Sequence, residues 1–353
     1  MAELKWNFWT NMAKIDESKF IDTNRIRSYK AIFNFINTCR NKGKTWGFAK
    51  VAFCQFKKHG KTTLWIRRFA DEIEKTKGKI FKKKLKKELG LNSKNFKWVG
   101  STAYYKRKNE FEPFLFLCTL SRAKSVRSGD EGATEFVIFD EYTTTPAKYA
   151  LYRGNEAEDF IDMVYSMKRE HAVTAFLLGN KESAINPYFR YFGIPAMPTN
   201  FEGIRTYNDG TILCYYSNTI PDEIAKTDFN KRFMTAIKNT PYAKYLSEGA
   251  IKGTSNRIEK KPRGAKFLCQ FDFIGGFSLF QSKNKIYVVA GVDKTKLVYV
   301  ETPKTYTKQL VIAPCDKVLF KELLEAYKYG LFYFDTPAAE ELFLPLKRIF
   351  AIK

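Results

Sequence analysis

The sequence predicts an α/β protein in which a mostly parallel sheet, covered by helices, is followed by a smaller β-rich domain. Three apolar segments, over residues 31–36, 136–139 and 173–178, predict buried parallel strands, and each leads into polar residues. Beyond residue 264, short β-type segments separated by turn residues predict the second domain. At 353 residues the chain is long enough for two domains.

The first apolar segment leads into a polar turn that ends in Gly43, Lys44 and Thr45, and apolar residues at three- and four-residue steps then predict a helix. A Gly-Lys-Thr turn between a strand and a helix is typical of a phosphate-binding loop. Its backbone N–H groups and the positive end of the helix dipole point at the same place. The usual pattern has glycine five residues before Gly43, where this chain has Thr38. The match is therefore incomplete, and its interpretation depends on the rest of the chain.

A second Gly-Lys-Thr, at Gly60, Lys61 and Thr62, is the alternative phosphate site. The residues before it keep helical spacing, and residues 64–69 after it are typical of a strand. A phosphate loop opens a helix, so this order fits the second turn poorly. We therefore favour the first turn.

Two further strand ends supply the chemistry that a nucleotide site needs. The segment 136–139 leads into Asp140 and Glu141, and the segment 173–178 leads into Gly179 and Asn180. Ligands gather at the carboxyl ends of strands in open α/β sheets. Asp140 can hold Mg²⁺ together with the turn's threonine hydroxyl, and Glu141 can position or deprotonate an attacking water. The amide of Asn180 can sense a γ-phosphate or the water, which together predicts an ATP and Mg²⁺ site.

The composition predicts a polyanionic partner. The chain carries 61 Lys and Arg against 37 Asp and Glu, a formal net charge of +24, which suits nucleic acid. The segment 81–88 holds five lysines and is either a solvated helix face or a DNA-backbone contact, and both interpretations remain open.

Six scattered cysteines and two histidines predict core thiols in a reducing compartment rather than a zinc site. The N-terminal residues lack the apolar core of a signal peptide. No segment approaches the ~20 apolar residues that cross a bilayer, so we expect no membrane partner.

Composition also predicts the domain boundaries. We expect an ATP-binding domain over residues 1–198, a connecting subdomain over 199–263 and the second, C-terminal domain over 264–353. The connecting subdomain has a hairpin signal at Asn208-Asp209-Gly210. It ends in residues 252–266, which are rich in Gly, Ser, Pro, Lys and Arg.

In order, the motifs NTCRNKGKT, LWIRRF, FVIFDEY, FLLGN, NPYF, GLFYFD and EELFLPLKRIF resemble those of a known family. This family is the DNA-packaging ATPases of small short-tailed picovirus-type phages, which are related to the terminase large subunit. The resemblance runs from about residue 30 to the end. It implies a P-loop ATPase domain of the additional-strand type, followed by a ribonuclease-H-like domain. It also implies an ATP-driven motor that translocates double-stranded DNA into a procapsid.

The resemblance assigns roles to individual residues of this chain. Lys44 would hold the β- and γ-phosphates, Thr45 the magnesium, and Asp140 and Glu141 would be the Walker B acid and the catalytic glutamate. Arg40 would lie near the γ-phosphate, and Asn180 would couple hydrolysis to movement. The whole phosphate-binding loop (Walker A) would comprise Thr38, Cys39, Arg40, Asn41, Lys42, Gly43, Lys44 and Thr45.

The same resemblance implies partners. Members use an arginine that reaches into the neighbouring subunit's site, and Lys168 and Arg169 are the nearest basic residues here, although their spacing does not match cleanly. Of the two, Arg169 is our candidate. The implied partners are double-stranded DNA, the phage portal on the procapsid, and further copies of the chain in a ring, a pentamer by resemblance. The implied location is the host cytoplasm, docked on the portal.

The carboxylates of the C-terminal domain at Asp272, Asp293, Asp316 and Asp335 have a spacing that suggests no particular two-metal cluster. The members of the family resemble terminases whose nuclease has lost its function, so the resemblance implies that this domain binds DNA or a portal component rather than cleaving DNA. Three alternatives remain. The chain could be another P-loop DNA translocase or helicase, a non-enzymatic basic DNA-binding protein with accidental Gly-Lys-Thr turns, or a packaging protein with an active nuclease.

Overall fold

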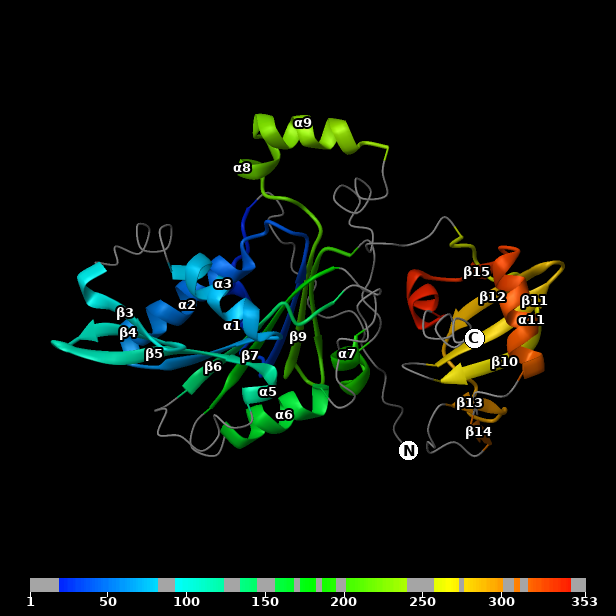
Figure 1. Ribbon diagram of the computed structural model, residues 1–353, viewed down its shortest axis with the longest axis horizontal. Helices are drawn as coiled ribbons and strands as arrows, with labels where there is room; N and C mark the ends of the chain where they lie inside the picture. Colours follow the sequence, from blue (N-terminus) through cyan, green and yellow to red (C-terminus); the bar gives the residue numbers. More distant parts are fainter. Residues whose placement is uncertain are drawn as a thin grey trace. The chain divides into compact units, whose positions relative to one another are not determined.

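The computed structural model describes eleven segments of the chain, which fall in two compact units (Figure 1). The first unit comprises 1–144, 152–181 and 200–250, and the second comprises 145–151, 182–199 and 251–353. The described segments are 19–81, 93–123, 134–144, 156–167, 172–181, 186–194, 201–239, 257–272, 276–300, 308–311 and 317–343.

Nine strands of the described residues form the sheet of the first unit, in the order β3-β4-β5-β2-β6-β7-β1-β9-β8. From β5 to β9 all neighbours are parallel, and antiparallel strands flank them at both edges. The mostly parallel sheet predicted from the sequence is confirmed. The strands are β1 (Phe33–Thr38), β2 (Thr62–Arg67), β3 (Phe96–Val99), β4 (Thr102–Arg107), β5 (Glu110–Thr119), β6 (Thr134–Asp140), β7 (Thr174–Asn180), β8 (Gly203–Tyr207) and β9 (Ile212–Ser217).

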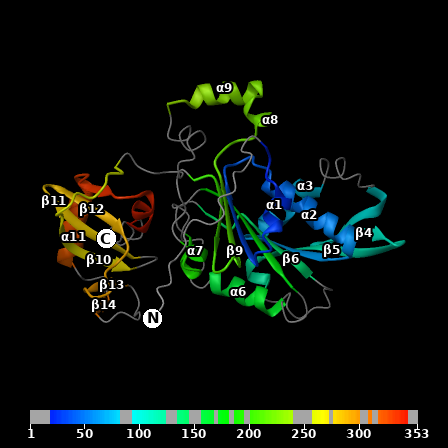
Figure 2. The same ribbon diagram turned by 180° about the vertical axis from the view of Figure 1, so that it is seen from behind.

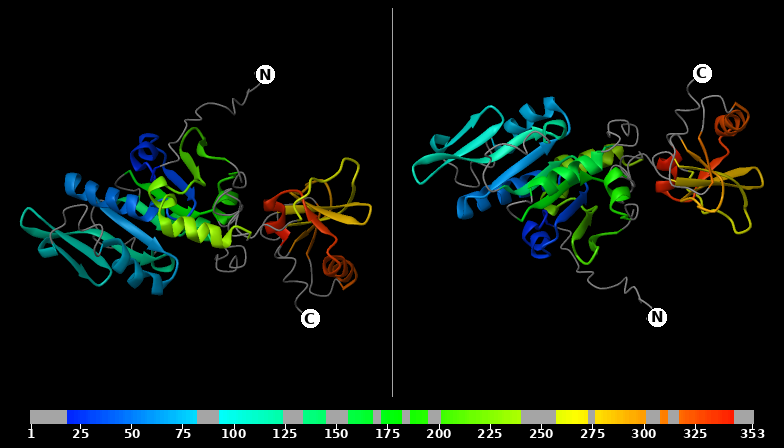
Figure 3. Two further views of the ribbon diagram at one scale, coloured as in Figure 1. Left: turned by 90° about the horizontal axis from the view of Figure 1, so that it is seen from above. Right: turned by 90° about the horizontal axis from the view of Figure 1, so that it is seen from below.

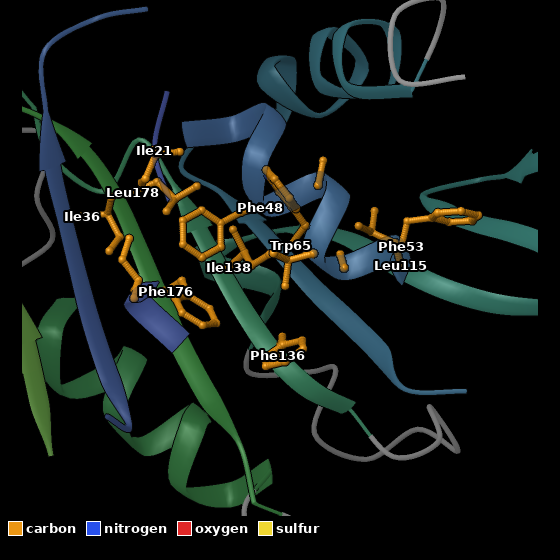
Figure 4. Packing of buried hydrophobic residues seen from close by; sticks show 14 of the residues in the cluster. Ile21, Ile36, Phe48, Phe53, Trp65, Leu115, Phe136, Ile138, Phe176 and Leu178 are labelled. Carbon is orange, nitrogen blue, oxygen red and sulfur yellow. The ribbon is translucent and has the colours of Figure 1, made fainter. Parts of the chain in front are cut away.

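Helices cover both faces of this sheet, because successive strand residues point to opposite sides. On one face, α2 packs Phe48 against Phe176 of β7, with ring centroids 4.6 Å apart (Figure 4). On the other, α6 packs Phe160 against Phe139 of β6 at 5.8 Å, and Figure 2 shows this layer from behind. The described helices of the unit are α1 (Thr23–Ser28), α2 (Lys44–His59), α3 (Ala70–Phe81), α5 (Leu120–Ala123), α6 (Glu156–Met167), α8 (Asp222–Ala225) and α9 (Asp228–Ile237), with a short 3₁₀ turn at Ser93–Asn95.

The region expected to form a connecting subdomain differs from the expectation. The hairpin predicted at Asn208 and Asp209 is present, and both residues have positive φ angles, 49° and 54°. Its second strand, β9, pairs in parallel with β1 along the whole of that strand, so β8 and β9 extend the first sheet. Local sequence predicts a hairpin, but the strand beside which it docks is set by contacts far away in the chain. The boundaries at 198 and 263 stay a prediction.

At the other edge of the sheet, β3, β4 and β5 form a three-stranded antiparallel ribbon, drawn from two sides in Figure 3. The second turn of this ribbon lies at Lys108 and Asn109, which both have positive φ angles.

The second unit has its own sheet, of six strands in the described residues, in the order β14-β13-β10-β11-β12-β15. Strands β10, β11 and β12 are antiparallel neighbours, and β13 and β14 run parallel to β10. This is the ribonuclease-H-like arrangement that the family resemblance implied. The elements are α7 (Pro187–Tyr191), β10 (Lys266–Asp272), β11 (Gly276–Ser282), β12 (Lys285–Ala290), β13 (Val298–Val300), β14 (Gln309–Val311), α11 (Lys317–Lys328) and β15 (Phe332–Phe334).

Two of the four carboxylates predicted in the C-terminal domain have hydrogen-bond partners of their own. Asp293 accepts hydrogen bonds from Thr295, and Asp335 accepts one from the backbone of Lys261, while Asp316 lies outside the described residues. Among the residues that the structure describes, no three His, Cys, Asp or Glu side chains group as a metal site would need. Within the same segments, no helix has the length and apolar character to cross a membrane.

Candidate nucleotide-binding site

The turn between β1 and α2 has the backbone of a phosphate loop. Gly43 precedes the helix with φ 79°, in the left-handed region that strains residues with a side chain. A Cβ atom there would also lie 2.9 Å from the ring of Phe20. The helix therefore opens immediately after Gly43, with Lys44 and Thr45 in its first turn. N–H groups in a first turn have no partner within the helix, so an anion is stabilised at this point.

The second Gly-Lys-Thr lies at the wrong end of the same helix. Gly60 caps the C-terminus of α2 with φ 70°, and its N–H donates to the carbonyl of Phe56 at 2.8 Å. Thr62 then begins β2. A helix C-terminus presents carbonyl groups and the negative end of the dipole, so the backbone of this turn cannot form a phosphate-binding loop. The structure thus supports the preference for the first turn.

The ammonium group of Lys44 is held at the tips of two strands. Its Nζ donates to Thr38 Oγ1 at 2.9 Å, to the Cys39 carbonyl at 3.2 Å and to Asn180 Oδ1 at 2.9 Å. Thr38 and Asn180 are register partners on β1 and β7, which is how residues so far apart in sequence meet. The three donors of the lysine therefore point to oxygen atoms at the mouth of the loop, where phosphate oxygens can replace them.

Thr45 and Asp140 face each other across the gap between α2 and β6. The Thr45 hydroxyl lies 3.2 and 3.3 Å from the two carboxylate oxygens of Asp140. Hydroxyl and carboxylate oxygens are the ligands that Mg²⁺ prefers, so the pair fits that ion. Burial raises the pKa of Asp140, and the nearby Arg67 guanidinium opposes this shift without cancelling it. A bound cation would favour the ionised carboxylate.

Arg67, at the end of β2, was not assigned a role from the sequence. It is 8% exposed and donates to Asp140 Oδ2 at 2.8 Å and to Glu141 Oε2 at 2.9 Å, and it lies 3.5 Å from Glu72. Burial acts to lower the pKa of Arg67, but the carboxylates of Asp140, Glu141 and Glu72 outweigh it and the net shift is upward. The signal in the sequence was an arginine pair directly after the apolar residues 64–66.

Glu141 has an unusual backbone conformation that its neighbours hold in place. Its φ is 62°, in the left-handed region, and its N–H donates to the Leu178 carbonyl at 2.8 Å. The next residue, Tyr142, is fully buried and donates its hydroxyl to Asn37 Oδ1 at 2.6 Å. The Tyr142 carbonyl accepts from Arg68 at 2.7 Å. Strained backbone persists only where the surroundings over-determine it, as here.

Two buried interactions join this region to its surroundings. Arg68 forms an ion pair with Glu156, the first residue of α6. Gly179 lies so close to the segment after β6 that a Cβ atom would meet Thr143 Oγ1 and Tyr142 Cε1 at 2.7 Å. These contacts therefore pack together the ends of β2, β6 and β7 and the start of α6.

Two buried lysines contact the segment after β9, Lys42 from the phosphate loop and Lys181 from the residue after β7. Lys42 Nζ donates to the Thr219 carbonyl at 3.1 Å, and Lys181 Nζ donates to Asn218 Oδ1 at 2.5 Å. Burial lowers the pKa of Lys181 to about 8, against the opposing effect of Glu202. Residues 218–221 lead directly into α8, so the hydrogen bond from Lys42 to Thr219 links the phosphate loop to the segment that precedes this helix.

The structure brings most of the predicted site residues together. Thr38, Lys44, Thr45, Asp140 and Asn180 are linked by the hydrogen bonds above, and Glu141 follows Asp140. Of the other loop residues, Cys39 donates its thiol to the Thr219 carbonyl at 3.4 Å, Asn41 has a positive φ, and Arg40 is exposed. Arg169 and Lys168 lie outside the described residues.

Comparison with known proteins agrees with this site and fold. The family model for the Podovirus DNA encapsidation protein (Gp16) matches residues 15–348. The DNA packaging protein of Bacillus phage PZA is 24% identical over 345 residues, which cover 95% of this chain and 98% of that protein. The DNA packaging protein of Bacillus phage phi29 is 23% identical with the same coverage.

A solved structure confirms the fold. A chain in the bacteriophage Phi-29 viral genome packaging motor assembly superposes with a TM-score of 0.71 at 21% identity, covering 94% of this chain and 100% of that one. Both the sequence resemblance and the two-part α/β architecture inferred above are confirmed by these matches. The chain belongs to the Podovirus DNA encapsidation protein (Gp16) family.

Proposed function

We propose that this chain is the ATP-driven motor that translocates double-stranded viral DNA into a procapsid. One observation carries the proposal: Lys44 and Thr45 begin α2, and they hydrogen-bond to Asn180 and Asp140 at the ends of β7 and β6. The names of the relatives, both DNA packaging proteins, support it, as does the net charge of +24.

Each residue has a distinct task in ATP hydrolysis. The loop N–H groups and Lys44 bind the β- and γ-phosphates, and Arg40 lies on the same loop to reach the γ-phosphate. Thr45 and Asp140 are the residues that would hold Mg²⁺, which would neutralise phosphate charge there. Glu141 orients the attacking water and accepts its proton. Asn180, at the end of β7, accepts a hydrogen bond from Lys44. Loss of the γ-phosphate would change this contact and so pass to β7.

Glu141 must leave Arg67 before it can act on water. Its carboxylate is bound by Arg67 at 2.9 Å, while its side chain is 55% exposed. A pair with one partner this exposed is weak and opens readily, since water screens it. Opening this pair is the step that makes the base available.

The motor acts as a ring of copies docked on the portal of the procapsid in the host cytoplasm. Arg169, just beyond the described end of α6, is the residue proposed to enter the neighbouring subunit's site. The printed description of the Phi-29 structure as a motor assembly supports such an arrangement.

The Glu141→Gln variant tests the proposal. It keeps the shape of the side chain and removes the base, so ATP should still bind while turnover falls by about 10²-fold or more. Phosphate release with and without double-stranded DNA measures this. The matched control is Glu135→Gln, at the opposite end of β6, which should hydrolyse ATP normally.

A packaging reaction completes the test. Purified chain, procapsids, DNA and ATP should yield DNA that resists nuclease, and Glu141→Gln should yield none. Undiminished hydrolysis in Glu141→Gln would remove the site assignment. Hydrolysis without packaging would assign the chain to the other P-loop DNA translocases.

A further inference from the structure

The second Gly-Lys-Thr, which the nucleotide site does not use, lies at the opposite end of the parallel strands. β2 runs from Thr62, beside this turn, to Arg67 at the nucleotide site. The last turn of α2, immediately before Gly60, consists of Lys57, Lys58 and His59, all exposed. This end of the first unit therefore carries a cluster of positive charge.

The ribbon at the sheet edge adds to this cluster. Lys106, Arg107 and Lys108 lie where β4 turns into β5. The Arg107 guanidinium lies 5.9 Å from the ring centroid of Phe56 in α2, and it forms an ion pair with Glu112 at 3.2 Å. It also lies so close to Gly60 that a Cβ atom there would collide with it. Arg107 therefore fixes the ribbon (Figure 1) against the end of α2. We call Lys57, Lys58, His59, Lys106, Arg107 and Lys108 the basic corner.

Structural roles account for only part of this charge. Arg107 is paired with Glu112, and cations in the last turn of α2 complement the helix dipole. Yet Lys57, Lys58, Lys106 and Lys108 form no ion pair with any residue that the structure describes, and the two ribbon lysines gain nothing from the dipole. Like charges held on a rigid helix end and a rigid ribbon repel one another, and a polyanion removes that cost.

We propose that the basic corner binds the phosphate backbone of double-stranded DNA. The inference rests on the proposed function, in which DNA is the cargo, and it names the surface that grips it. Lysines are point charges that contact phosphates without reading bases, as a motor that moves any sequence requires. Because the corner lies at the other end of β2 from Arg67, DNA contact and nucleotide contact use separate side chains.

The test is a full-length chain in which Lys57, Lys58, Lys106 and Lys108 are all changed to glutamine. Binding to a fluorescent duplex DNA of mixed sequence is followed by anisotropy between 50 and 200 mM salt. Each lost phosphate contact removes about 0.9 from the slope of log affinity against log salt. The slope should therefore become shallower by about 3 to 4, and affinity should fall at low salt.

Two controls separate this surface from general charge and from misfolding. Lys226, Lys231, Arg232 and Lys238, around α9, are also exposed, and changing them to glutamine removes the same charge. That variant should keep most of the salt slope. Replacing the four corner lysines by arginine should retain DNA binding, and ATP affinity without DNA should be unchanged in all variants.

An unchanged slope in the corner variant would overturn the proposal, and so would an equal loss in the α9 control. If a duplex RNA of the same length loses affinity while DNA does not, the corner binds RNA and the DNA proposal is wrong. A wild-type chain that binds DNA through the corner but hydrolyses no ATP would leave this inference standing and remove the proposed function.

Discussion

Among single residues, Arg67 forms ion pairs with Asp140 and Glu141, the two acids that we propose for the nucleotide chemistry. In Arg67→Met the buried Asp140 loses its cation, and breaking a buried pair in this way costs about 3–5 kcal/mol of stability. Mg²⁺ bound by Asp140 and Thr45 would replace the lost charge. We expect Mg²⁺ to raise the unfolding temperature of Arg67→Met more than that of the wild type, without nucleotide. An equal response in both proteins would contradict the Mg²⁺ assignment.

Lys181 gives the protein a specific dependence of stability on pH. Its pKa is about 8 in the folded chain against 10.5 ordinarily, because it is buried. Below pH 8 the folded state bears the full cost of burying the charge. Between pH 8 and 10.5 the folded state releases its proton while the unfolded state keeps it, so stability rises with pH.

The free energy of unfolding in urea, compared between the wild type and Lys181→Met, measures this effect. Lys181→Met has no group to titrate at this position. The difference between the two proteins should shift in favour of the wild type by about 2 kcal/mol from pH 7 to pH 10. A difference that stays constant with pH would contradict the burial of a charged lysine.

Which residues the sequence could identify depends on whether their role is local. Lys44 and Thr45 follow from a strand, a turn and a helix in succession, and Asp140 and Asn180 from polar residues directly after apolar strands. The contact of Arg67 with Asp140 needs β2 beside β6, which no local pattern reveals. The pair of Tyr142 and Asn37 likewise depends on the order of strands in the sheet.

Among the elements, the segment after β6 packs closely against the end of β7 because Gly179 has no side chain. In Gly179→Ala the new Cβ would meet Thr143 and Tyr142 at 2.7 Å, and such overpacking costs typically 1–3 kcal/mol. We expect a lower unfolding temperature and slower ATP turnover, since the displaced segment follows Glu141. Both are measured on the purified variant. Full stability and full turnover would show that the segment adjusts without cost.

Element positions were predicted better than element partners. The hairpin expected at Asn208 and Asp209 joins β8 and β9, and the β-rich segments expected beyond residue 264 are β10 to β13. The three-residue strand β14 was missed, because so short a segment carries no periodicity. The docking of β8 and β9 onto β1 was also missed, since the pairing of Phe33 with Ile212, 179 residues further along the chain, depends on the assembled sheet.

In the molecule as a whole, the proposed nucleotide site and the basic corner lie at opposite ends of the parallel strands of the first unit. The proposed nucleotide site lies where β1, β6 and β7 end, and the basic corner lies beside the start of β2. We propose that the basic corner is the place where part of the net charge of +24 meets DNA, rather than adding only a general attraction. The proposed motor would then bind ATP and DNA at the same time through separate surfaces.

We propose that the chain hydrolyses ATP at the first of its two Gly-Lys-Thr turns. ATP turnover without DNA is compared in Lys44→Ala and Lys61→Ala, the same substitution at the same position of each turn. We predict that Lys44→Ala loses turnover by about 10²-fold or more while Lys61→Ala retains it. Normal turnover in Lys44→Ala, or its loss in Lys61→Ala alone, would show that ATP is not hydrolysed at the first turn.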